Sequence, residues 1–360
     1  MQGIKIHRIF NGFLFAIVMM FYFKSIFVIV CWMYLCDKFV TNKALKTRIV
    51  RATKRVWLNL TMAALHIYFP QPIYVHYNPI ILEKVKNIVI SNHLTEYDWL
   101  FILNLLYHLG RYDDVCIILK QSLKNIPLVG YGMRFFGFIF LNRQLDKDKQ
   151  IINEGAERLI HQAKYDLLIF PEGTYIDSFS FPKSRRFASD KKIEVNGKAF
   201  NPQNVLVPRT SGFNVLKEEL LEDMEGVVDI TMLVSPYESF PQEVYSYVDT
   251  VLDFKRRLSF VFYIDFVSNK KQIDNPNFLY SVFKEKDELI EKYKASFGKD
   301  TFKDLKDFIS KTSALGISKE KFRYKVIDMR SRWCTFFYTT FIVADISISY
   351  ALYKFFRIFI

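Results

Sequence analysis

Residues 91–98, with the sequence SNHLTEYD, carry side chains that proton-transfer chemistry uses. His93 and Asp98 are five residues apart, and five steps along a helix turn a side chain by about 140°, so one helix face cannot hold both. We therefore predict that His93 lies in a loop and that Asp98 begins the next helix, where its carboxylate can reach the imidazole. An aspartate that accepts from one ring nitrogen leaves the other free to take a proton from a hydroxyl, as a general base does.

The same stretch permits a simpler interpretation, in which it is an ordinary helix start. Asn92 or Thr95 would then cap the helix, and His93 would be a surface residue. The stretch alone does not separate the two interpretations, because a histidine near an aspartate is not diagnostic.

Arg143 follows the apolar run 137–141. Its planar guanidinium suits a phosphate or carboxylate, which it can contact with two hydrogen bonds. A surface arginine paired with Asp146 or Asp148 is the more frequent arrangement for such a residue.

Two later apolar runs also end in polar residues. Residues 167–174 (LLIFPEGT) place Glu172 after a strand-like run, in a turn whose glycine lets a ligand approach the backbone. Residues 207–213 (VPRTSGF) add a second arginine, Arg209, in a loop of small and polar residues.

The elements that must position these residues alternate between strands and helices, which predicts an α/β fold with a largely parallel sheet flanked by helices. Open α/β sheets place their sites at the carboxyl ends of strands, where His93, Arg143 and Glu172 fall. Strands are predicted at 73–76, 87–90, 115–119, 137–141, 166–170, 205–207, 227–234 and 258–267, and helices at 98–108 and 149–163.

Composition favours a membrane-associated protein. Aromatic residues make up 17% of the chain, with 36 Phe and 21 Tyr, and the net charge is +13. Nucleic acid is the competing partner for so basic a chain. However, residues 38–55 hold seven Lys or Arg and no acid directly after an apolar N-terminal run, so we expect membrane lipids and no nucleic acid.

Both ends of the chain contain apolar segments. Residues 9–36 are long enough to span a bilayer, or to form a re-entrant hairpin that bends near Lys24. Residues 333–353 form a second candidate, interrupted by Asp345. Basic residues follow the first segment and precede the second, which places residues 38–332 on the cytosolic side. The four cysteines show neither a disulfide framework nor zinc spacing.

These features predict five parts of the chain. They are an N-terminal membrane segment (1–37), basic amphipathic membrane-proximal helices (38–69), a catalytic domain (70–270), a charged helical extension with a possible partner-binding role (271–332) and a C-terminal membrane segment (333–360). In the second part, Leu45, Ile49, Ala52 and Val56 have helical spacing, as in a basic helix lying on anionic headgroups.

Taken in order, four blocks resemble the pattern of the glycerolipid acyltransferases, the 1-acylglycerol-3-phosphate and lysophospholipid acyltransferase family. The blocks are His93-x4-Asp98, residues 137–143, residues 170–174 (FPEGT) and residues 207–210 (VPRT). The resemblance extends over about residues 87–235 and is greatest to the eukaryotic endoplasmic-reticulum branch, with its lysocardiolipin and lysophosphatidylinositol acyltransferase-like proteins. One departure is the linker 177–204, which is rich in Lys, Arg and Ser.

The resemblance implies acyl transfer from acyl-CoA, as co-substrate, to a free hydroxyl of a lysophospholipid, without a cofactor. It implies that His93 is the base, that Asp98 orients it, and that Arg143 holds the acceptor's phosphate. It assigns acceptor binding also to Glu172, Gly173 and Thr174, and supporting roles to Asn92, Lys120, Pro171, Pro208 and Arg209. The implied location is the endoplasmic-reticulum membrane, with the catalytic domain facing the cytosol.

Two other functions fit the same residues: a hydrolase whose His93 and Asp98 activate water, and a non-catalytic membrane scaffold. A metal site is not expected, because His93 and Glu96 have no second clustered ligand. For an acyltransferase, the preferred acyl length is expected to depend on how the apolar segments and Phe135-Phe136 wall the acyl channel.

Overall fold

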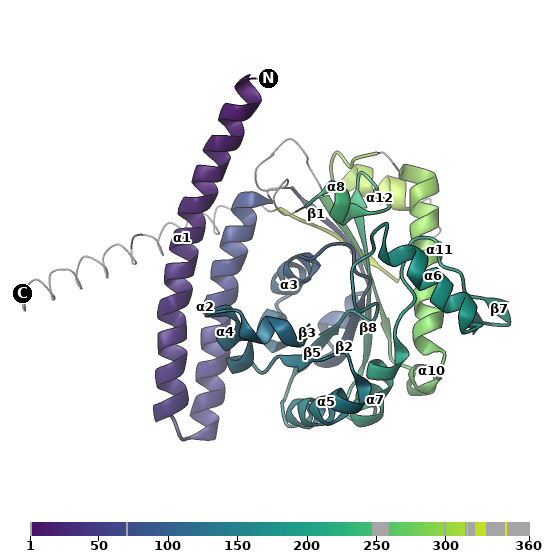
Figure 1. Cartoon of the computed structure of the whole chain (residues 1–360). Coiled ribbons are helices and arrows are strands. Elements are labelled where there is room, and N and C mark those ends of the chain that lie inside the picture. Colours follow the sequence, from purple (N-terminus) through teal and green to yellow (C-terminus); the bar gives the residue numbers. More distant parts are fainter. Residues whose placement is uncertain are drawn as a thin grey trace, which may run out of the picture.

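The structure is a computed structural model of the 360-residue chain, in which residues 2–69, 71–246, 259–298, 300–313, 315, 321–328 and 343 are described. The predicted C-terminal membrane segment lies outside the described residues, apart from residue 343. An eight-stranded sheet forms the centre of the molecule, with helices on both faces (Figure 1).

The strands follow the order β10-β1-β9-β8-β2-β5-β3-β4 across this sheet. Their bounds are β1 Ile73–Tyr77, β2 Lys86–Ser91, β3 Val115–Lys120, β4 Ile139–Leu141, β5 Tyr165–Ile169, β8 Gly226–Ser235, β9 Ser259–Val267 and β10 Arg323–Ile327. The strands β6 (Glu194–Val195) and β7 (Lys198–Ala199) form a separate hairpin.

The predicted α/β fold with a largely parallel sheet is confirmed, with two antiparallel pairings added. Neighbouring strands pair in parallel except at β1/β10 and β8/β9. The five strands β8, β2, β5, β3 and β4 therefore run in one direction, and their carboxyl ends share one edge of the sheet. Residues that follow these strands are brought together at that edge.

Helices cover the sheet as two layers. Their bounds are α1 Gln2–Phe39, α2 Lys43–Tyr68, α3 Asp98–His108, α4 Val129–Phe135, α5 Leu145–Ile160, α6 Ser180–Asp190, α7 Thr210–Leu220, α8 Pro241–Val244, α10 Lys270–Asp274, α11 Phe278–Phe297 and α12 Leu305–Ser313. Single 3-10 turns occur at η1 Pro79–Leu82, η2 Tyr112–Asp114 and η3 Gln121–Asn125.

The apolar residues of the central strand β2 point alternately to the two layers, as a pleated strand requires. Val89 packs in the cluster that contains α2 and α3. Ile88 and Ile90 pack on the other face with α5 and α7. All three side chains are fully buried, so β2 is fixed on both sides and the loop that follows it starts from a rigid base.

The N-terminal helix α1 lies alongside α2 at one side of the sheet domain (Figure 1). The pair is joined by hydrogen bonds from Trp32 Nε1 to Thr53 Oγ1 at 3.2 Å and between the hydroxyls of Tyr22 and Thr61 at 3.0 Å. Within α1, residues Arg8–Phe39 are long and apolar enough to cross a membrane, with a mean hydropathy of 2.4 over a window of 18 residues. The helix runs without interruption past Lys24, so the re-entrant bend considered from the sequence is not present.

Three basic residues of α2 bind the sheet domain, which the amphipathic pattern did not predict. Arg51 pairs with Asp114 at 3.1 Å and Arg55 with Asp113 at 2.6 Å, while the buried Lys54 donates to the carbonyl of Val115. Leu45 and Val56, from the predicted apolar stripe, stay exposed. Part of the positive charge of α2 is therefore used to dock the helix on the domain.

The described part of residues 271–332 is built into the fold, in contrast to the separate extension expected from its charge. Strand β10 pairs with β1 at the edge of the sheet. Lys286 of α11 is fully buried and donates to the carboxylate of Asp229 and, at 2.6 Å, to the carbonyl of Ile230. A buried lysine needs such a partner, and the contact pins α11 to β8.

The predicted strand at residues 205–207 is wrong. The N–H groups of Leu206 and Val207 bond to the side chains of Glu172, at 2.8 Å, and Ser184, at 2.7 Å, and not to a neighbouring strand. The apolar side chains that suggested a strand are buried in this extended loop.

His76 of β1 gives the fold an acid-sensitive position. Its ring is fully buried, stacks on Phe322 at 4.5 Å, and has no hydrogen-bond partner among the described residues. Burial lowers the pKa of His76 to about 4. Between about pH 6.5 and 4, His76 binds a proton in the unfolded chain but not in the folded chain. The free energy of unfolding therefore falls by about 1.4 kcal/mol for each pH unit of acidification.

We therefore expect His76→Phe, which fits among the surrounding rings, to remove this dependence. In urea unfolding in detergent, the variant should lose about 2 kcal/mol less than the wild type between pH 6.5 and 5. His161→Gln, at an exposed position, serves as the control and should behave as the wild type. Equal losses in His76→Phe and the wild type would contradict the assignment.

Candidate active site

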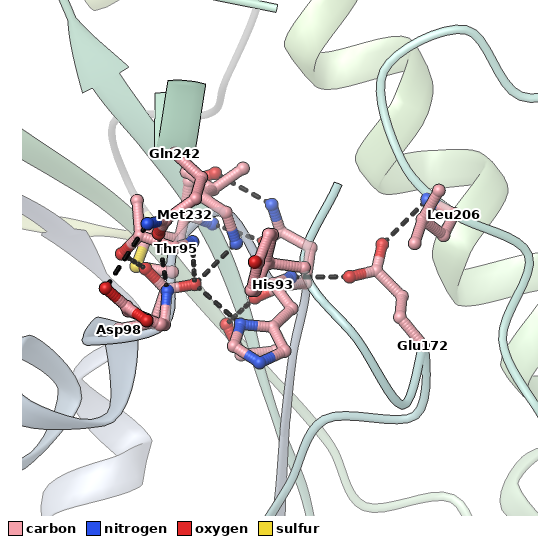
Figure 2. Close-up of polar contacts among 12 residues, drawn as sticks. His93, Thr95, Asp98, Glu172, Leu206, Met232 and Gln242 are labelled. Atoms are coloured by element: carbon pink, nitrogen blue, oxygen red, sulfur yellow. Dashed lines mark hydrogen bonds and ion pairs between the residues drawn. The ribbon is translucent and has the colours of Figure 1, made fainter. Parts of the chain in front are cut away.

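His93 and Asp98 meet where β2 ends, as the sequence predicted (Figure 2). His93 lies in the loop after β2, and Asp98 is the first residue of α3. The His93 Nδ1 atom is 3.0 Å from Asp98 Oδ2. The helix-cap interpretation fails, because the N-cap residue of α3 is Tyr97 and it makes no side-chain cap hydrogen bond.

The Asp98 carboxylate is fully buried and held by the loop it supports. Its Oδ2 atom also accepts from the backbone N–H groups of Leu94 and Thr95, and its Oδ1 accepts from Thr95 Oγ1 at 2.6 Å. With the carboxylate in this place, Nδ1 of His93 is the donor, so the lone pair of the neutral ring is on Nε2. Nε2 makes no hydrogen bond within the described part of the chain. The site therefore holds an oriented imidazole with one nitrogen free to accept a proton.

Asn92 fixes the start of this loop. Its side-chain amide accepts from Met232 N at 2.7 Å and donates to Met232 O at 2.9 Å, so it pairs with β8 as a strand residue would. The side chain is buried and has no room for a ligand contact. Asn92 is a positioning residue for His93.

Glu172 also positions His93, although the resemblance had assigned it to acceptor binding. Its carboxylate accepts from the backbone N–H groups of His93, at 2.6 Å, and Leu206, at 2.8 Å (Figure 2). The side chain is almost completely buried, and this burial raises the pKa of Glu172 well above its ordinary value. Glu172 thus joins the loop after β2 to the segment before α7.

The turn that contains Glu172 brings two further groups to the site. The ring of Phe170 stacks on that of His93 with centroids 4.4 Å apart. Gly173 adopts a φ of +75°, and a Cβ there would lie 3.4 Å from the guanidinium of Arg209. The backbone N–H of Arg209 donates a hydrogen bond to the carbonyl of Pro171 at 2.8 Å. Glycine at position 173 therefore allows the guanidinium of Arg209 to pack against the turn.

Arg143 and Arg209 form an unneutralised pair of cations. Among the described residues, neither guanidinium has a hydrogen-bond or ion-pair partner. Burial and the positive charge of Arg209 together lower the pKa of Arg143. Both side chains are exposed, so solvent screens part of the repulsion between the two like charges, and an anion between them would relieve the rest.

Asp148 holds the loop that carries Arg143, a role that the sequence did not reveal. Its buried carboxylate accepts from the backbone N–H groups of Asn142, at 2.7 Å, and Gln144, at 2.9 Å. Between them, Arg143 has a φ of +64°, a conformation that a residue other than glycine adopts only under constraint. The surface pair of Arg143 with Asp148 that the sequence allowed is thus replaced by a backbone clamp.

These groups share one cavity of about 1430 Å³. Its polar lining includes His93, Lys120, Arg143, Glu172, Thr174 and Arg209, and Pro208 lines it beside Arg209. Its apolar lining comes from several helices and strands and includes Tyr22, Phe23, Trp57, Leu65, Leu100, Leu103, Ile117, Leu119 and Phe136. A drug-sized ligand occupies about 300–1,000 Å³, so the cavity has room for one long apolar chain and a polar head, or for two substrates.

One wall of the apolar part depends on a close helix contact. A Cβ at Gly132 of α4 would lie 2.4 Å from the ring of Trp57, so glycine lets α4 pack directly on α2. Phe136 follows α4, packs edge-on against Trp57 at 5.4 Å and lines the cavity. Of the predicted Phe135-Phe136 wall, Phe136 therefore contacts the cavity, whereas Phe135 is not among its lining residues.

Within the described ranges, no group of three His, Cys, Asp or Glu side chains is arranged to hold a metal ion. Cys116 is buried in β3, and burial raises the pKa of its thiol to about 11. A thiol with so high a pKa is protonated near neutral pH and does not act as a nucleophile.

Residues 72–236 match the sequence model of the Acyltransferase family. The chain is 27% identical over 251 residues to a 2-acyl-1-lysophosphatidylinositol acyltransferase of Saccharomyces cerevisiae, covering 58% of this chain and 62% of that protein. It is 31% identical over 209 residues to lysocardiolipin acyltransferase 1 of Mus musculus, covering 53% of each chain. The matched region thus spans about half to two thirds of these curated relatives.

A solved structure is also similar: the 1-acyl-sn-glycerophosphate acyltransferase PlsC of Thermotoga maritima, with a TM-score of 0.46 and 14% identity, covering 80% of this chain and all of that chain. The strand order and the two helix layers define the α/β fold of this chain.

Proposed function

We propose that this protein is an acyl-CoA-dependent O-acyltransferase that acylates a free hydroxyl of a lysophospholipid. One observation carries the proposal: an imidazole oriented by a buried carboxylate shares a cavity with two guanidinium groups that have no acid partner among the residues the structure describes. The imidazole can activate a hydroxyl, and the two guanidinium groups can bind the phosphate of the molecule that carries this hydroxyl.

In the proposed reaction, Nε2 of His93 takes the proton of the acceptor hydroxyl. At the same time, the hydroxyl oxygen attacks the carbonyl carbon of the thioester. A C–O bond forms, the C–S bond breaks, and the leaving thiolate takes the proton back from the imidazolium. Asp98 supports the transient positive charge on the ring. The chain ends the cycle in its starting state, with an ester and free CoA as products.

Direct transfer needs no acyl-enzyme intermediate. The buried Cys116 is protonated, and the sequence contains no Gly-x-Ser-x-Gly nucleophile motif. This leaves His93 as a base acting on the acceptor itself.

The class of acceptor is inferred from charge and shape. The mutual repulsion of Arg143 and Arg209 favours a phosphate between them, and the cavity continues into an apolar part that fits an acyl chain. Two relatives are named a lysophosphatidylinositol and a lysocardiolipin acyltransferase, and these acceptors combine a phosphate with an acyl chain. Lysophosphatidic acid has the same two features.

We place the enzyme on the endoplasmic-reticulum membrane with the catalytic domain towards the cytosol, where acyl-CoA is available. The apolar helix α1, with Phe10, Phe13, Phe27 and Trp32 exposed, supports membrane association. The excess of positive charge in residues 38–55 supports the cytosolic orientation.

The purified protein in detergent should release CoA from acyl-CoA only when a lysophospholipid is added, and the acyl chain should be recovered in the diacyl product. A panel with lysophosphatidic acid, lysophosphatidylinositol and monoacylglycerol measures the dependence on phosphate. We expect acylation of the phosphate-bearing acceptors and little of monoacylglycerol. CoA release at the same rate without any acceptor would instead favour a thioesterase.

A further inference from the structure

The cavity extends to a helix that the proposed reaction does not use. Residues Phe179, Lys183 and Phe187 line it, and their spacing of four places them on one face of α6. They belong to the basic linker 177–204, in which the sequence departs from the family pattern. The same cavity contains His93 and the two arginines.

Lys183 is the cation of α6 that is available to a ligand. Its Nζ atom lies 3.4 Å from the centroid of the Phe179 ring, and it forms no ion pair within the described part of the chain. The other two cations of the helix have partners: Arg185 donates to Asn201 Oδ1 at 2.7 Å, and Arg186 pairs with Asp190 at 3.7 Å. Neither of them lines the cavity.

An acyl-CoA donor brings more negative charge than one pair of arginines can neutralise. Its nucleotide end carries a ribose 3′-phosphate, a pyrophosphate and an adenine ring, whereas the acceptor's phosphate already fits between Arg143 and Arg209. Phe179 presents a ring that is 71% exposed next to the ammonium group of Lys183. A base stacked on an aromatic side chain contributes about 1–3 kcal/mol, and a lysine ammonium is a frequent phosphate partner.

We propose that the face of α6 formed by Phe179, Lys183 and Phe187 binds the 3′-phosphoadenosine end of acyl-CoA, an inference that rests on the proposed function. Lys183 contacts the 3′-phosphate, and the ring of Phe179 stacks on the adenine. The donor then enters the cavity from α6 with its thioester directed towards His93.

The position of α6 favours a water-soluble ligand over a lipid surface. In Figure 1, α6 lies on the opposite side of the sheet from α1 and α2. The large exposed apolar residues are concentrated on α1, where a lipid acceptor would arrive. The part of the cavity lined by α6 is therefore left for the donor.

The test compares Lys183→Ala with Arg186→Ala, a neighbouring exposed cation on the same helix that does not line the cavity. Each variant is assayed with acyl-CoA and with 3′-dephospho-acyl-CoA. For Lys183→Ala, we expect KM for acyl-CoA to rise by about tenfold or more, as the loss of a charge-assisted hydrogen bond predicts. KM for 3′-dephospho-acyl-CoA and for the lysophospholipid should stay unchanged, and Arg186→Ala should match the wild type. An equal effect of Lys183→Ala on both donors would overturn the proposal.

Binding of adenosine 3′,5′-bisphosphate, measured by calorimetry on the full-length protein, separates this inference from the proposed reaction. The site is supported if Lys183→Ala abolishes binding of the bisphosphate and Arg186→Ala preserves it. If no lysophospholipid is acylated in that case, the proposed function alone fails. Conversely, acyl transfer with no binding of the bisphosphate to the wild type overturns the site alone. If both variants lose affinity for phosphatidylserine vesicles and keep full discrimination between the two donors, α6 is a membrane-surface helix and the proposal is wrong.

Discussion

Replacing His93 with alanine is expected to lower kcat for acyl transfer by about 10²–10⁴-fold, the usual contribution of a positioned general base. The hydroxyl of a lysophospholipid has a pKa far above neutral, so its proton must leave as the thioester is attacked. Among the described residues, His93 is the only histidine that lines the cavity. Asp98 binds its Nδ1 atom, so Nε2 is the nitrogen that can act as the base. The measurement is the release of CoA by purified protein with a saturating lysophospholipid.

Loss of structure must be separated from loss of the base. The bond from the His93 backbone N–H to Glu172 does not depend on the ring, and Asp98 keeps its bonds from Leu94 and Thr95, so the variant should unfold at nearly the wild-type temperature. His161→Ala, at an exposed position, is the matched control and should retain full kcat. If His93→Ala keeps wild-type acylation, His93 is not the base, and the scaffold interpretation gains support.

Replacing Arg143 with alanine is expected to raise KM for the lysophospholipid by about 10–100-fold, because charge-assisted hydrogen bonds contribute about 1.5–3 kcal/mol. KM for acyl-CoA should change little if the pair of arginines holds the acceptor's phosphate. The variant should also lose the preference for phosphate-bearing acceptors over monoacylglycerol. A rise in KM for acyl-CoA alone would assign Arg143 to the donor.

Replacing Asp148 tests the role of Arg143 in a second way, because it displaces the guanidinium without removing it. Asp148→Ala frees the N–H groups of Asn142 and Gln144, so Arg143 should leave its left-handed conformation and KM for the lysophospholipid should rise. In the double variant with Arg143→Ala, the two effects should not add, because both act through one side chain. Asp146→Ala, exposed in the same helical turn, is the control. Additive effects would show that Asp148 acts on stability alone.

Part of this site was predictable because it depends on short-range geometry. The separation of five positions between His93 and Asp98 excludes a common helix face. It therefore requires a loop followed by a helix start, and the structure has both. The apolar runs that end at Ile90, Leu141 and Ile169 are buried parallel strands, and such strands bring their carboxyl ends to one edge. The order of polar residues along the chain was therefore enough to place His93, Arg143 and Glu172 near one another.

The role of Glu172 and the conformation of residues 205–207 were not predictable, because both depend on where backbone N–H groups lie in space. Glu172 was expected at the acceptor, yet its carboxylate is used by His93 and Leu206, which are far from it in sequence. The run 205–207 was expected as a strand, but tertiary contacts take its N–H groups to side chains instead. Apolar composition predicts burial, whereas hydrogen-bond partners decide whether a buried segment is a strand.

The sequence by itself determined the α/β class, the pairing of His93 with Asp98 and the apolar, basic N-terminal region, because each follows from local spacing or composition. Only the tertiary structure decided that Asp148 clamps Arg143, that α1 and α2 wall the same cavity as His93, and that Lys183 of α6 reaches it too. These facts depend on contacts between residues distant in sequence, and the periodicity of a chain carries no information about which distant surfaces meet.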